Sequence, residues 1–150
     1  MKASLRKLAI STLIFAATAL VGPALRWATW PPARSEGISS TSTGTFVSDL
    51  LFLIWPTQSL AVIEVSAGKL LAAVVSVGTN ILVFAFLGMI AGALVGRRWG
   101  LFPLYLATGA LLVLFASWGA GFSFAYFNVP ALVMGLLLYA TPFYLTARLV

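Results

Sequence analysis

The largely apolar run over residues 70–95 constrains this chain more than any other feature of its sequence. It holds 26 residues and no charged one, and Arg97 and Arg98 follow it closely. As a helix it would measure about 39 Å, against about 30 Å for the hydrocarbon core of a bilayer. A soluble core does not require so long a stretch without charge. We therefore predict a membrane-spanning helix that tilts or protrudes.

Composition extends this prediction to the whole chain. Of its 150 residues, 61% are hydrophobic and 8% are charged, whereas soluble domains carry about 25% charged residues. Further apolar runs cover 8–25, 101–118 and 129–147. Backbone polar groups in lipid must be paired within the chain, which favours helices. We predict an all-α fold: one transmembrane domain over 1–150, built as an integral membrane four-helix bundle.

The N-terminal run allows two interpretations. Lys2, Arg6 and Lys7 precede the apolar residues 8–25, which would form a helix of about 27 Å. A basic start before a short apolar run is also typical of a secretory signal, for which residues 17–19 would supply a small-residue cleavage site. We take the uncleaved span as the prediction and the cleaved signal as its alternative.

The stretch 26–69 is expected to hold a loop and then a broken helix over 46–68. Asp49 is suited to cap a first helical piece, and Pro56 would end it. Thr57 is suited to cap a second piece, which contains Glu64. The segment either crosses the membrane once or forms an interfacial or re-entrant element.

The basic residues distinguish these topologies. If 46–68 does not cross, one side of the membrane carries Lys2, Arg6, Lys7, Arg97, Arg98 and Arg148, and the other carries Arg26, Arg34 and Lys69. If it crosses, Lys2, Arg6, Lys7 and Lys69 oppose Arg26, Arg34, Arg97, Arg98 and Arg148. Cytoplasmic loops are enriched in Lys and Arg. The topology with six basic residues on one side and three on the other is therefore favoured over the topology with four and five. We predict a multi-pass protein of the inner membrane with both termini cytoplasmic.

Three glycines at intervals of four residues predict a helix-packing interface. Gly88, Gly92 and Gly96 remove side chains from one helix face, so that a second backbone can approach closely. The expected partner is either the run 101–118 of the same chain or a helix of another chain. The row continues through Phe84, Asn80 and Ser76, and its drift around the helix suits a partner that crosses at an angle.

Asn80, Asp49 and Glu64 are the candidate polar or ion contacts, because a polar group at membrane depth must face protein or water. The structural alternatives are an interhelical hydrogen bond for Asn80, a helix cap for Asp49, and pairing with Lys69 or water for Glu64. Arg97, Arg98 and Lys7 are candidate contacts for anionic lipid headgroups. Their role in setting topology would explain them equally well.

The absence of cysteine and histidine from the sequence limits its chemistry. Thiolate nucleophiles, imidazole acid–base catalysis and Cys/His metal sites are excluded, and we expect no cofactor, no metal and no enzyme activity. The basic residues are not clustered as nucleic-acid binding requires. The first hypothesis is an accessory subunit or assembly factor of a larger membrane complex. The alternative is a small oligomeric transporter or channel with a polar path near Asn80, Asp49 and Glu64.

Overall fold

In a computed structural model of the chain, every element that the structure describes is helical, which confirms the all-α prediction. The described residues are 2–29, 46, 49–51, 53–59, 69–97, 100–119 and 129–150. The elements are α1 (Lys2–Thr18), α2 (Val21–Thr29), the 3₁₀ helix η1 (Pro56–Ser59), α5 (Lys69–Leu94), α6 (Leu101–Gly119) and α7 (Val129–Leu149). The helical stretches long and apolar enough to cross a membrane are Ser4–Ala28, Ala73–Leu94 and Val129–Leu149. Leu101–Leu114 of α6 is a shorter apolar helix.

The first apolar run contains a break that its apolar pattern did not predict. Helix α1 ends at Thr18, and α2 begins at Val21 after a turn at Ala19 and Leu20. Pro23 explains the break, because it has no N–H to donate to the carbonyl four residues earlier, which is that of Ala19. The Leu20 N–H bonds instead to the Ala17 carbonyl at 3.2 Å, a tighter three-residue turn.

Helix α5 ends on a glycine. Gly96 has a φ of +86°, a left-handed conformation that glycine adopts without steric cost. The Arg97 N–H turns back to the Leu94 carbonyl at 3.1 Å. Gly96 therefore terminates the helix. A Cβ at this position would meet nothing within 4 Å, so Gly96 takes no part in the packing of α5 on the described part of the chain.

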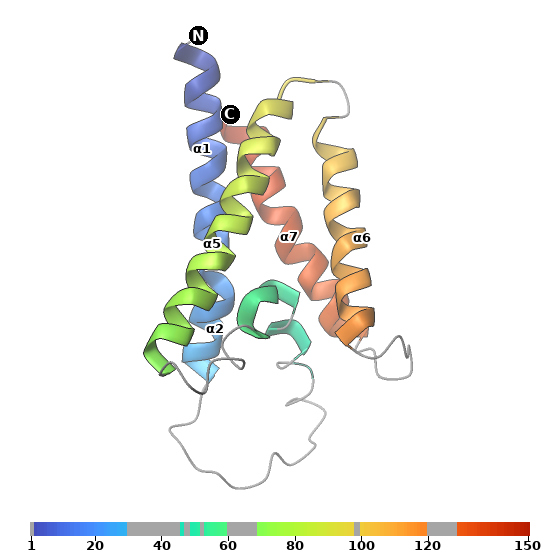
Figure 1. Ribbon diagram of the computed structural model, residues 1–150. Coiled ribbons are helices and arrows are strands. Elements are labelled where there is room, and N and C mark those ends of the chain that lie inside the picture. The colour runs from blue at the N-terminus through green and yellow to red at the C-terminus, as the bar shows by residue number, and fades with distance from the viewer. Residues whose placement is uncertain are drawn as a thin grey trace, which may run out of the picture.

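Helices α1 and α5 pack against each other along most of their length, and α7 lies behind them (Figure 1). Helix α6 lies against α7 and has far fewer contacts with α5. Both chain termini lie at the end of the bundle where α5 finishes and α6 begins (Figure 1). The described part of 46–59 lies at the opposite end, between α2 and α5 on one side and α6 and α7 on the other (Figure 1).

Aromatic rings join α1, α5 and α7 in the core. Phe15 meets Phe143 edge to face with ring centroids 5.0 Å apart, and Phe84 lies 5.3 Å from Tyr139. Tyr105 of α6 joins them through Phe143, at 5.5 Å. Such ring pairs add about 0.5–1.5 kcal/mol each beyond the apolar area they bury.

The glycine face of α5 packs on α1. A Cβ added at Gly88 would lie 2.8 Å from the backbone of both Ser11 and Thr12, and one at Gly92 would lie 3.0 Å from the Leu8 Cα. The expected contact with 101–118 is therefore wrong. The prediction paired the runs 70–95 and 101–118 because they are neighbours in the sequence. In the structure, the glycine face of α5 packs on α1 instead.

The helix crossing at Gly88 provides a stability test. Gly88→Ala should lower the free energy of unfolding by about 1–3 kcal/mol, because the methyl group overlaps backbone atoms that cannot rotate away. Gly78→Ala is the matched control in the same helix, since a Cβ there meets nothing within 4 Å. It should leave stability unchanged or raise it by up to about 1 kcal/mol through helix propensity. Equal thermal midpoints for the two variants in detergent would contradict this packing.

Candidate functional site

Among the described residues, four polar side chains are completely buried where the helices meet, and we call them the polar seam: Ser11, Ser76, Asn80 and Thr146. They come from α1, α5 and α7. The Ser11 hydroxyl donates to the Gly88 carbonyl at 2.7 Å and lies 3.4 Å from the Thr146 hydroxyl. The glycine crossing and the polar seam thus occupy the same interface, because the missing glycine side chain leaves its carbonyl within reach of a hydroxyl.

Asn80 compensates for the helix break at Pro23. Its side-chain Nδ2 donates to the Ala19 carbonyl at 2.9 Å, and that carbonyl is the one whose helical partner Pro23 removes. An unpaired carbonyl in an apolar interior costs about 1–3 kcal/mol. The structure thus places Asn80 in an interhelical hydrogen bond. Its other side-chain atom, Oδ1, is buried without a hydrogen-bond partner among the described residues.

A reciprocal pair of hydrogen bonds ties η1 to α5. The Thr57 hydroxyl donates to the Ser76 carbonyl at 2.7 Å, and the Ser76 hydroxyl donates to the Thr57 carbonyl at 2.6 Å. Each hydroxyl thereby satisfies a carbonyl on the other chain segment. The prediction that Thr57 caps a further helix over 60–68 lies outside the described residues.

The described residues just before η1 are α-helical, as the sequence suggested, and the backbone changes to a 3₁₀ helix at Pro56. Residues 49–51 and 53–54 are helical, Trp55 is not, and η1 begins at Pro56. Asp49 itself has helical backbone, and so does Phe46 three residues earlier. A helix cap adopts non-helical backbone, so the predicted cap at Asp49 is wrong.

Two glycines that the sequence analysis did not single out make room for this segment. A Cβ at Gly22 of α2 would lie 2.7 Å from the Trp55 Cβ, and one at Gly135 of α7 would lie 3.2 Å from a Leu53 methyl group. The Tyr139 hydroxyl donates to the Leu53 carbonyl at 3.2 Å. The described residues 49–51 and 53–59, which we call the wedge, are therefore packed between α2, α5 and α7.

The depth of the wedge follows from helix geometry. Gly22 lies seven residues before the end of α2 at Thr29, Ser76 lies seven residues after the start of α5, and Gly135 lies six residues after the start of α7. At 1.5 Å per residue, this corresponds to about 10 Å. The part of the chain around Leu53–Thr57 therefore reaches well into the bundle from the end opposite the termini.

The remaining candidate residues are scattered. Asp49 is half-buried, and its burial raises the pKa of its carboxyl group above the usual range. The Asn80 amide donates to the Ala19 carbonyl instead. Lys7 is half-buried and Arg97 is exposed, both at the end of the bundle that carries the termini. Glu64 and Arg98 lie outside the described residues. In the part of the chain that is described, no group of three acidic residues comes together as a metal site would require.

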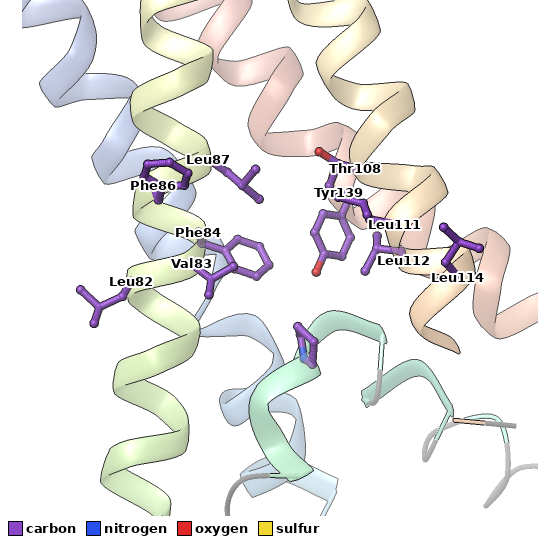
Figure 2. Close-up of a pocket in the computed structure, with 11 residues that line it drawn as sticks. Leu82, Val83, Phe84, Phe86, Leu87, Thr108, Leu111, Leu112, Leu114 and Tyr139 are labelled. Atoms are coloured by element: carbon purple, nitrogen blue, oxygen red, sulfur yellow. The ribbon is translucent and has the colours of Figure 1, made fainter. Parts of the chain in front are cut away.

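A cleft of about 750 Å³ opens between α5 and α6. Figure 2 shows Phe84 and Leu87 of α5 facing Leu112 of α6 and Tyr139 of α7 across it. Pro56 of η1 also lines the cleft. No signal in the sequence indicated this cleft, because it results from α6 packing on α7 while standing away from α5.

Comparisons with known proteins return no match: no protein-family model, no curated protein and no solved structure matches this chain.

Two tyrosines of α7 test the docking of the wedge. Tyr139→Phe should lower the free energy of unfolding by about 1 kcal/mol, because it leaves the buried Leu53 carbonyl without its donor. Tyr144 is 60% exposed, so Tyr144→Phe is the control and should have almost no effect. Thermal or chemical unfolding in detergent measures both variants. A loss at Tyr144 that equals the loss at Tyr139 would contradict the docked arrangement.

Proposed function

We propose that the chain is an integral membrane protein of four spans, built from α1 with α2, α5, α6 and α7, with both termini on the cytoplasmic side of the inner membrane. The observation that supports insertion is the distribution of apolar surface. Leu13, Leu82 and Leu111, on three different helices, are 65–71% exposed, while the polar seam is completely buried within the bundle. This arrangement is unfavourable in water and favourable in hydrocarbon.

The position of the basic residues supports the orientation. Arg6, Lys7, Arg97 and Arg148 lie at the end of the bundle that carries both termini (Figure 1). The wedge lies at the other end, and in this topology it is a re-entrant element that enters the bilayer from outside without crossing it.

Single cysteines test this topology, since the natural chain contains none. Trp27→Cys should react with a membrane-impermeant maleimide on intact cells, and Val150→Cys should react only in inverted vesicles. Leu137→Cys is the control for the bilayer itself. Leu137 is 59% exposed, yet a thiol in hydrocarbon stays protonated and unreactive. Labelling of Leu137→Cys from water, or of Val150→Cys on intact cells, would contradict the proposal.

Within the membrane, we propose that the protein is a non-catalytic accessory subunit or assembly factor that binds transmembrane helices of a larger complex. The observation that carries this proposal is the use of its buried polar groups. Ser11, Ser76 and the Asn80 amide nitrogen all donate to carbonyls of other segments of the same chain. These groups are engaged in holding the bundle together, which leaves a rigid body with an apolar exterior suited to helix–helix contact.

The mass of the native assembly tests this role. Solubilised from native membranes in a mild detergent, the chain should elute with a larger membrane protein at fixed stoichiometry, as measured by light scattering and mass spectrometry. The association should survive purification in a second detergent, because it rests on helix packing. A homo-oligomer free of other proteins would contradict the accessory role.

One observation favours transport or conduction as a second candidate. Asn80 Oδ1 and Trp55 Nε1 are a buried acceptor and a buried donor without partners among the described residues. Polar atoms of this kind at membrane depth could contact a polar solute or an ion. Under this candidate the homo-oligomer would support flux into liposomes, and Asn80→Leu would abolish it.

A further inference from the structure

Among the described residues, those that line the cleft between α5 and α6 leave no polar side-chain group free for a ligand. Two of its lining residues carry hydroxyls, and both are engaged: Thr108 donates to the Leu104 carbonyl at 2.8 Å, and Tyr139 donates to the Leu53 carbonyl. The other lining side chains are aliphatic or aromatic. A ligand in the cleft would therefore be held by dispersion and by its exclusion from water. These interactions favour a hydrocarbon ligand.

A second hollow lies between the same three helices at the end that carries the termini. It measures about 270 Å³ and is lined by the end of α5, the start of α6 and Ala147 of α7, with Arg97 at its edge. Arg148 follows Ala147 and is also exposed. All three acidic residues of the sequence fall at positions 36, 49 and 64, between α2 and α5. The hollow thus carries positive charge that complements an anionic group.

The two hollows have the spacing of a lipid headgroup and its chain. Along α5, Leu94 lines the hollow near Arg97, and Leu87 and Phe84 line the cleft. Seven to ten residues separate these positions, which is about 10–15 Å along the helix. Half of a hydrocarbon core of about 30 Å is also about 15 Å. An acyl chain whose headgroup lies beside Arg97 would therefore end in the cleft.

The size of the cleft argues against a partner helix as its occupant. One turn of a helix with its side chains, about 10–12 Å wide and 5.4 Å high, occupies about 400–600 Å³. A cleft of about 750 Å³ admits fewer than two turns, whereas a spanning helix has about 20 residues. A narrow flexible chain fills such a space more completely.

We propose that the protein binds one anionic phospholipid of the cytoplasmic leaflet, with its headgroup beside Arg97 and an acyl chain in the cleft between α5 and α6. This site rests on the membrane placement proposed above. It is independent of the accessory role, because the lipid occupies a surface between helices of this chain.

Photocrosslinking locates the acyl chain. The full chain is placed in nanodiscs of equal phosphatidylcholine and phosphatidylglycerol, with a phosphatidylglycerol probe that carries a diazirine at the end of its acyl chain. Crosslinked peptides should concentrate on 82–87 of α5 and 108–114 of α6. Leu111→Trp fills the cleft and should remove these crosslinks. Leu106, also exposed on α6, lies outside the lining, so Leu106→Trp should retain them. Val83→Trp fills the cleft from α5 if Leu111→Trp fails to fold.

Native mass spectrometry tests the headgroup. Arg97→Gln should lower the ratio of retained phosphatidylglycerol to phosphatidylcholine about fivefold, the equivalent of about 1 kcal/mol for one basic residue. Arg6→Gln, an exposed cation at the same end but outside the hollow, should leave the ratio unchanged.

Three results would overturn the site: crosslinks spread evenly over all helices, crosslinks unaffected by the cleft-filling variants, or an unchanged lipid ratio in Arg97→Gln. A helix of another protein crosslinked within the cleft would overturn it as well. Cysteine labelling and the mass of the native assembly test the proposed topology and role separately, so failure of the lipid site would leave those results intact.

Discussion

The crossing of α1 and α5 is the contact on which the rest of the structure depends. Gly88 and Gly92 bring the two backbones together, and at that distance the Ser11 hydroxyl reaches a main-chain carbonyl. Phe15 and Phe84, from the same two helices, then present their rings to α7. A side chain at Gly88 would separate the helices and remove this hydroxyl–carbonyl contact together with the packing.

The polar groups of the interior compensate for irregular backbone. Pro23 removes a main-chain donor, and Asn80 supplies one in its place. The interrupted α-helical backbone around Pro56 is held by Ser76 and Tyr139, each of which donates to a carbonyl of the wedge. Such backbone is tolerated at depth only where neighbouring elements satisfy it. Among the described residues, these buried donors are therefore placed against specific carbonyls of other segments of the chain.

The sequence predicted the helices well because they rest on local properties. Apolar runs bounded by charge and glycine define α5, α6 and α7 to within two residues, and spacing alone selected the buried row of α5 from Ser76 to Gly92. The residues that contact that row lie far away in the sequence, so no local pattern predicts them. The roles of Gly22 and Gly135 likewise require the wedge to be in place.

A double-mutant cycle between Pro23 and Asn80 tests the central claim most directly. In the natural chain, Asn80→Leu removes the donor to the Ala19 carbonyl and should cost about 1 kcal/mol of unfolding free energy. In the Pro23→Ala background the main chain regains its own donor to that carbonyl, so the same substitution should cost clearly less, with a coupling of at least about 0.5 kcal/mol. Additive effects of the two substitutions would contradict the claim that Asn80 compensates for the break between α1 and α2.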